Sequence, residues 1–123
     1  MRFGYLAAGA ALMVATPAFA HVKLLSSTPG ANAVVAAPSK LQLVFSEPVI
    51  ARLSGVDLEM TEMPGMKMTS PHKMQVSVSV DGDGKRMIVS PATPLTRGAY
   101  KLVWHAVAND THRVESNFSF KVK

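Results

Sequence analysis

The chain has 123 residues, a formal net charge of +5 and no cysteine, and 48% of its residues are hydrophobic. This length fits one small domain, and without cysteine the fold must rest on core packing, while thiolate is excluded as a metal ligand. The lysines and arginines are scattered singly except for Lys85-Arg86. The charge therefore indicates solubility and argues against nucleic-acid binding, which needs clustered basic residues.

Residues 1–20 have the pattern of a secretory signal peptide. Arg2 supplies a positive charge, residues 6–14 form a short apolar run, and Ala18-Phe19-Ala20 is an A-x-A cleavage site. We therefore expect export, removal of residues 1–20 and a single mature domain over residues 21–123. Cleavage leaves His21 as the N-terminus, where its α-amine and ring Nδ1 can chelate a metal ion, and Cu(II) favours such nitrogen donors.

The rest of the chain alternates apolar and polar residues, which predicts strands. In chain order, strands are expected over residues 41–45, 76–80, 85–90, 99–107 and 117–122, with 81–84 as the turn of a hairpin. Tyr100 follows a turn-like segment, which predicts a tyrosine corner, where the hydroxyl bonds back to a loop carbonyl. These features predict an all-β Greek-key sandwich or barrel. Its expected aromatic core is Phe45, Trp104, Phe118 and Phe120.

Residues 60–74, here called the methionine segment, hold five methionines and one histidine. Pro64-Gly65 and Pro71 argue against a helix, so we expect a loop whose methionines have no packing role. Thioethers suit Cu(I), and they do not titrate as histidine does in acid. The alternative is an adaptable protein-binding surface. The candidate ligands are Met60, Met63, Met66, Met68, His72 and Met74.

Asp110-Thr111-His112 precedes the last strand. In extended backbone the first and third side chains point the same way, so a carboxylate and an imidazole would converge. If His21 lies beside them, its amine and imidazole together with the Asp110 carboxylate and the His112 imidazole suit tetragonal Cu(II). The alternative is that Asp110 and His112 are only a solvated surface pair. His105 is expected to be structural or solvent-facing. Glu47 is either a strand-end charge or a hydrogen-bond partner of an imidazole ligand.

Several stretches together resemble the CopC (also PcoC) family of bacterial periplasmic copper-binding proteins. They are residues 21–29, 43–48, 60–66, 91–101, 103–107 and 110–112. The resemblance implies a cupredoxin-like fold and a Cu(II) site made by the amine and ring of His21, by Asp110 and by His112. It also implies a separate Cu(I) site at the opposite end, with Met60 and two further ligands, Met63 and Met66. The segment departs from the family pattern after that point, so Met68, His72 and Met74 compete for the last ligand positions.

The function expected on this basis is that of a periplasmic copper carrier or sequestering protein for copper homeostasis or resistance, without enzymatic activity. The expected partners are copper ions, an inner-membrane copper transporter and other periplasmic copper proteins. We expect a monomer, with copper-dependent dimerisation through the open Cu(II) half-site as an alternative. Two other functions remain as alternatives: a copper-dependent oxidative enzyme that uses His21, and a metal-free interaction module that docks through the methionine segment.

Overall fold

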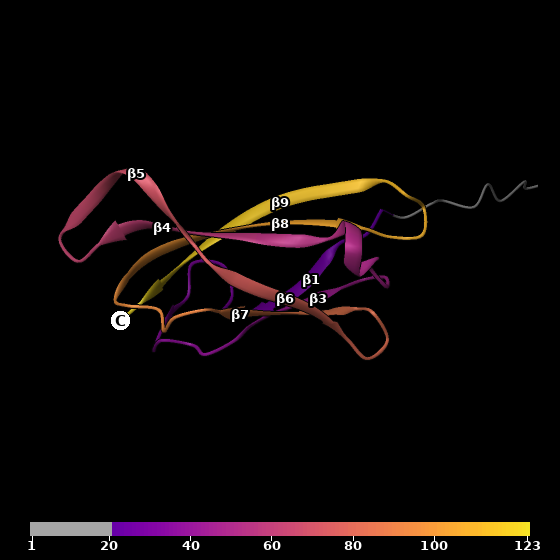
Figure 1. The fold of residues 1–123 in the computed structure, drawn as a ribbon, viewed down its shortest axis with the longest axis horizontal. Helices are drawn as coiled ribbons and strands as arrows, with labels where there is room; N and C mark the ends of the chain where they lie inside the picture. The colour runs from indigo at the N-terminus through magenta and orange to yellow at the C-terminus, as the bar shows by residue number, and fades with distance from the viewer. Residues whose placement is uncertain (1–20) are drawn as a thin grey trace, which may run out of the picture.

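The computed structural model describes residues 21–123, and every strand predicted from alternation is present in it. The strands of this range form two sheets packed face to face, which confirms the all-β sandwich (Figure 1). The four-stranded sheet has the order β1 (Leu24–Thr28), β3 (Leu41–Phe45), β7 (Arg86–Pro91) and β6 (Val76–Asp81). The five-stranded sheet has the order β2 (Val34–Val35), β9 (Arg113–Val122), β8 (Gly98–Val107), β4 (Gly55–Met63) and β5 (Met66–Met74).

The predicted signal peptide and its cleavage site lie outside the described residues. Within residues 21–123 the only helical turn is η1 (Ala51–Leu53), and no helix there has the length and apolar composition of a membrane span. The hairpins β4–β5, β6–β7 and β8–β9 each lie within one sheet, and the chain changes sheet between them. The predicted hairpin over residues 76–90 is thereby confirmed as β6–β7.

The core lies between the sheets and is built from alternate residues of the central strands. Phe45 of β3 meets Trp104 of β8 edge-on across the two sheets, with ring centroids 5.2 Å apart. Such a contact adds about 1 kcal/mol to the gain from burial alone. Phe120 is also buried, and Phe118 is half-buried against the core. The central buried set from β3 and β8 is Leu41, Leu43, Phe45, Tyr100, Leu102, Trp104 and Ala106.

The predicted tyrosine corner is present at the start of β8. The Tyr100 hydroxyl donates a hydrogen bond of 2.6 Å to the carbonyl oxygen of Thr96, and the ring stacks on Phe120 at 5.6 Å. The side chain is fully buried, so this bond satisfies a polar group that would otherwise be costly to bury. The corner fixes the loop that leads from one sheet into the other.

The loop prediction for the methionine segment is wrong, because residues 60–74 belong to the hairpin β4–β5. Pro64-Gly65 forms its two-residue turn, in which Gly65 has a φ of 72° and Met63 pairs with Met66. A proline followed by a glycine of positive φ is typical of a type II turn. Pro71 is tolerated because β5 is the edge strand of its sheet. The prolines and glycine that argued against a helix are therefore compatible with strands.

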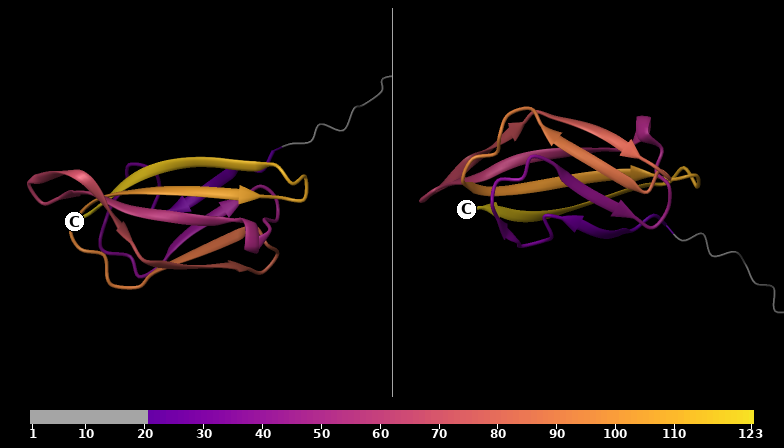
Figure 2. Two further views of the ribbon diagram at one scale, coloured as in Figure 1. Left: turned by 45° about the horizontal axis from the view of Figure 1, so that its top comes forward. Right: turned by 90° about the horizontal axis from the view of Figure 1, so that it is seen from below.

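The hairpin is irregular in its middle. Between the pairs Met60–His72 and Glu62–Lys67, β4 advances by two residues and β5 by five. The extra residues leave β5 bulged away from its partner. The hairpin turn protrudes from one end of the sandwich, whereas the described chain begins at the other end (Figures 1 and 2).

Candidate metal centre

Three side chains converge where the start of the described chain meets the β8–β9 turn. The Nδ1 atoms of His21 and His112 each lie 3.6 Å from the same oxygen, Oδ2 of Asp110. The two imidazole rings are tilted against each other with centroids 5.3 Å apart. One ligand atom from each of the three residues fits within a 4.8 Å span. We call this group the histidine–aspartate cluster, and it brings together the three residues singled out in the sequence.

The backbone brings Asp110 and His112 together by a turn, and not by the extended conformation considered from the sequence. Thr111 has a φ of 63°, and its amide donates a hydrogen bond of 2.9 Å to the carbonyl oxygen of Ala108. Oδ1 of Asp110 accepts a hydrogen bond of 3.2 Å from the His112 amide. This local bond, typical of aspartate in turns, holds the carboxylate beside the imidazole.

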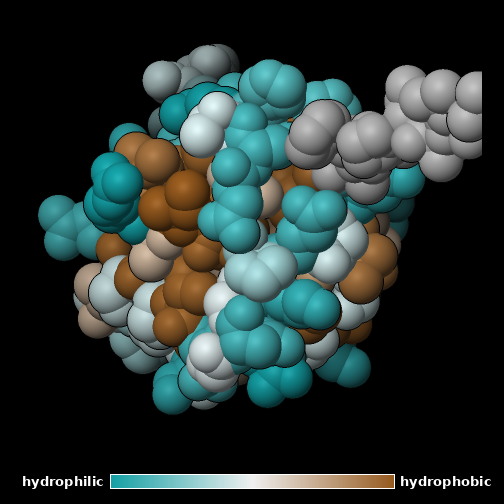
Figure 3. Space-filling view, turned by 90° about the vertical axis from the view of Figure 1, so that its right-hand side faces the viewer, coloured by the Kyte–Doolittle hydropathy of each residue, from teal (hydrophilic) through white to brown (hydrophobic). Residues whose placement is uncertain are grey.

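Oδ2 of Asp110 is the electrostatic centre of the cluster. It is a buried side-chain oxygen without a hydrogen-bond partner among the described residues, and the Asp110 side chain is only 11% exposed. The imidazoles are open to solvent, at 62% and 65% exposure. A buried carboxylate oxygen without a donor is costly. A cation held between it and the two imidazole nitrogens would remove that cost. Figure 3 looks onto this end of the molecule, whose surface is largely hydrophilic with a patch of apolar residues.

His21 is held at the cluster by the two residues that follow it. Val22 is buried in the core at 2% exposure. The Lys23 amide donates to the Ser46 hydroxyl, and the Ser46 amide donates to the Lys23 carbonyl oxygen, both at 2.8 Å. This exchange ties the N-terminal segment to the residue that follows β3. The sequence analysis did not single out Ser46, and only its place at the end of the β3 alternation marks it.

A second serine steadies the other side of the cluster. The Ser54 hydroxyl accepts a hydrogen bond of 3.0 Å from the amide of Val107, the last residue of β8. The Val107 carbonyl oxygen accepts another, of 2.7 Å, from the Ile50 amide. The two chain segments that carry the histidine–aspartate cluster are therefore both hydrogen-bonded to the body of the sandwich.

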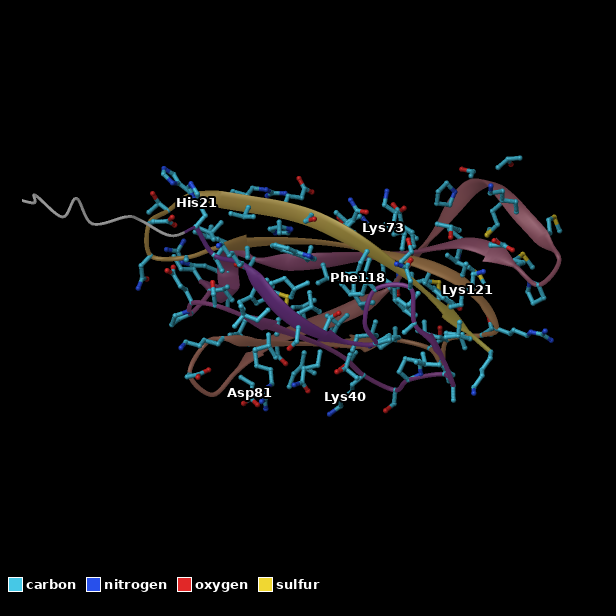
Figure 4. All side chains as sticks on the ribbon, turned by 180° about the vertical axis from the view of Figure 1, so that it is seen from behind. His21, Lys40, Lys73, Asp81, Phe118 and Lys121 are labelled. Carbon is cyan, nitrogen blue, oxygen red and sulfur yellow. The ribbon has the colours of Figure 1, made fainter. Side chains whose placement is uncertain are left out.

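The methionine segment lies at the opposite end of the sandwich from His21 (Figure 4). Met63 and Met66 flank its turn and are 42% and 59% exposed, whereas Met60 is buried at 8%. Met68 and Met74 are half-buried against the core. The exposed His72 pairs with Met60 across the hairpin. The structure thus places all six candidates on one hairpin but spreads them between core and solvent. The expectation that the methionines have no packing role is wrong for Met60, Met68 and Met74.

His105 and Glu47 stand apart from both groups. His105 pairs with Gly55, and its Cε1 would lie 3.0 Å from a Cβ built on that glycine. The imidazole therefore packs over the backbone of Gly55, which has no side chain of its own, in agreement with a structural role. Glu47 is half-buried, and within residues 21–123 its carboxylate has neither a hydrogen bond nor an ion pair to protein. The hydrogen bond to an imidazole considered for Glu47 is therefore not formed within residues 21–123.

Comparison with known proteins identifies the family. The model of the CopC domain matches residues 24–123. The chain is 47% identical to Copper resistance protein C of Pseudomonas syringae pv. tomato, over 93% of this chain and 90% of that protein. It is 43% identical to Copper resistance protein C of Escherichia coli, over 96% and 94%.

Solved structures agree with this relationship. The crystal structure of selenomethionine PcoC, a copper resistance protein from Escherichia coli, matches with a TM-score of 0.79 and 44% identity over 82% of this chain and 99% of that one. CopC from Methylosinus trichosporium OB3b matches at 20% identity with a TM-score of 0.71, covering 84% and 94%, which supports the fold. The chain belongs to the CopC family.

Proposed function

We propose that this protein binds copper in the bacterial periplasm and carries or sequesters it for copper homeostasis or resistance. The observation that carries the proposal is the unpaired Oδ2 of Asp110, held 3.6 Å from the Nδ1 atoms of both His21 and His112. Two imidazoles and a carboxylate, without thiolate, are donors that suit Cu(II). The names of the copper resistance relatives support copper as the cargo.

The proposed Cu(II) ligands are the ring and α-amine of His21, the ring of His112 and the carboxylate of Asp110. The amine is free only if residues 1–20 are removed as a signal peptide, and that same cleavage would accompany export to the periplasm. The cluster is open because both rings are exposed to solvent. A copper ion there can take a further ligand from water or from a second chain, which would allow a copper-dependent dimer of an otherwise monomeric protein.

The proposed Cu(I) site lies on the methionine segment. Met63 and Met66 face each other beside the turn and are largely exposed, so their thioethers are available to a soft ion. Met60 is buried and would need a rotamer change to join them. Met68, His72 and Met74 supply the remaining donors.

Two sites of different softness would let one protein hold both oxidation states without catalysing a reaction. Neutral thioether ligands exchange readily, so Cu(I) would pass by ligand exchange to an inner-membrane transporter or to another periplasmic copper protein. The protein would then act as a copper chaperone of the periplasm, not as an enzyme.

The decisive test is a Cu(II) titration followed by electron paramagnetic resonance. The protein that starts at His21 is compared with one that keeps Ala20, which blocks the amine. We expect a tight nitrogen-rich tetragonal signal only from the first. His112→Ala should weaken and alter this signal, and His105→Ala, which removes a histidine outside the cluster, should not. An unchanged signal in His112→Ala would overturn the proposed ligand set.

A further inference from the structure

A groove runs beside the methionine segment, between the hairpin turn and the end of β9. It is lined by the exposed apolar side chains of Val34 and Met63, and by the cations Arg97, Lys121 and Lys123. These residues come from four separate parts of the chain, so the fold gathers charges that are scattered singly in the sequence. Lys121 lies at the hairpin end of the molecule, far from His21 (Figure 4).

The three cations of the groove are available to a ligand. Arg97, Lys121 and Lys123 are all exposed, and none of them forms an ion pair with another residue of 21–123. Glu62 is the one acidic residue in the lining. The groove therefore carries an excess of positive charge, which attracts an acidic surface and repels a second copy of the same face.

Exposed apolar side chains are also concentrated at this end of the molecule. Among the described residues six large hydrophobic side chains are exposed, and three of them lie at this end: Val34 at 59%, Met63 at 42% and Met66 at 59%. Copper binding accounts for the methionines but not for Val34, which has no donor atom. An apolar centre with a charged rim is the composition of a protein-binding surface.

We propose that this groove docks an acidic segment of a partner protein, with apolar or thioether side chains that contact Val34 and Met63. The inference rests on the proposed Cu(I) role of the methionine segment, because docking here would bring the partner's ligands beside Met63 and Met66. Electrostatic attraction would raise the rate of encounter, and the apolar contacts would fix the register. The partner class is therefore an acidic copper acceptor or donor.

The test uses the copper-free protein, so that it does not depend on metal binding. A short synthetic peptide of alternating Glu and Met is titrated into the isotope-labelled domain of residues 21–123 at low salt, and amide shifts are recorded by NMR. We expect saturable shifts at Val34, Met63, Arg97, Lys121 and Lys123. A peptide of alternating Lys and Met should cause none. Absent shifts, or shifts spread evenly over all basic residues, would overturn the proposal.

Charge-removing variants sharpen the test. Replacing Arg97, Lys121 and Lys123 together by Gln should weaken peptide binding by about tenfold or more at low salt. The matched control replaces Arg52, Lys85 and Arg86, which are exposed cations of η1, the β6–β7 turn and the start of β7. This control should bind normally. An equal loss of peptide affinity in both variants would show that only the overall charge matters, and it would overturn the proposal of a specific groove.

Two further outcomes separate this inference from the proposed function. If vesicles of anionic lipid shift the groove amides and the peptide does not, the groove binds membranes and the partner proposal is wrong. If the peptide docks but the protein fails to retain Cu(I), the docking proposal is supported and the proposed Cu(I) site is wrong. If Cu(I) is retained and the peptide does not dock, only the docking inference falls.

Discussion

Lys23 and Ser46 exchange two hydrogen bonds of 2.8 Å, one through the serine hydroxyl and one through its amide. They stand two residues from His21 and at the end of β3, so they set where the first imidazole lies relative to Asp110. A terminal segment without such ties would be mobile. If the histidine–aspartate cluster binds metal as proposed, its affinity should therefore depend on Ser46, which does not contact the three side chains of the cluster.

Ser46→Ala removes the hydroxyl bond and leaves the amide bond. We expect Cu(II) affinity to fall roughly fivefold, corresponding to a hydrogen bond of about 1 kcal/mol, as measured by competition with a chelator. Ser46→Thr should restore most of the affinity, and Ser26→Ala, at an exposed position of β1, should leave it unchanged. Equal affinities in Ser46→Ala and Ser26→Ala would show that Ser46 has no positioning role.

Asp110→Asn keeps the size of the side chain and its acceptor Oδ1 but removes the charge. Removing a group that only hydrogen-bonds to a metal ligand lowers metal affinity about 10- to 100-fold. Because the Asp110 carboxylate is proposed as a ligand itself, its loss should lower Cu(II) affinity by at least about tenfold. Asp83→Asn is the matched control, because Oδ1 of Asp83 accepts a similar turn bond of 3.0 Å from the Lys85 amide. Isothermal titration of both variants tells a ligand from a turn residue, and normal Cu(II) binding by Asp110→Asn would exclude the carboxylate.

Tyr100→Phe removes the hydroxyl of the tyrosine corner and keeps the ring. We expect the free energy of unfolding to fall by about 1 kcal/mol, measured by chemical denaturation, with Cu(II) affinity unchanged. A domain of this size would lose about 4–8 °C in melting temperature. Unchanged stability would mean that water replaces the lost donor at the Thr96 carbonyl oxygen at no cost.

Gly98→Ala tests the close packing of β8 against the bulged hairpin. A Cβ at Gly98 would clash with the Glu62 carbonyl oxygen and with the Met60 methyl carbon, and the φ of 154° disfavours a side chain. We expect a loss of about 2 kcal/mol in stability and weaker Cu(I) binding as Met60 is displaced. Gly30→Ala, where the nearest atom is 3.8 Å away, should be nearly neutral. If Gly98→Ala and Gly30→Ala are equally stable, β8 and the hairpin can move apart without cost, and the predicted close packing at Gly98 is wrong.

The two proposed sites should respond differently to pH. Imidazole and amine ligands must lose their protons to bind a metal, so Cu(II) affinity should fall as the solution is made more acidic. Thioethers do not titrate, so Cu(I) retention under a reductant should change far less. His72→Ala should abolish any remaining acid sensitivity of Cu(I) binding if His72 is a ligand. Parallel loss of both ions in acid would contradict a thioether site.

The strands with one buried face were predictable because alternation alone marks them. The pattern of Leu41, Leu43 and Phe45 and that of the residues around Trp104 correspond directly to β3 and β8. The hairpin β4–β5 was missed although Val56, Leu58 and Met60 alternate and are buried. Its prolines indicated a loop, and only the position of β5 at a sheet edge makes Pro71 acceptable.

The residues of the histidine–aspartate cluster could be predicted, but the means of their convergence could not. Asp110 and His112 meet through a turn with positive φ at Thr111, which the residue types do not specify. His21 reaches them because β1 pairs with β3 and Val22 is buried, and both are long-range contacts. A single sequence carries no local signal for such pairing.

The strand β8 begins beside the methionine segment at Gly98 and ends beside the histidine–aspartate cluster at Val107. At about 3.3 Å per residue it separates the two by roughly 30 Å. No side chain can bridge that gap, so direct ligand exchange could not pass an ion from one proposed site to the other within one molecule. Each end would fill and empty according to its own surroundings.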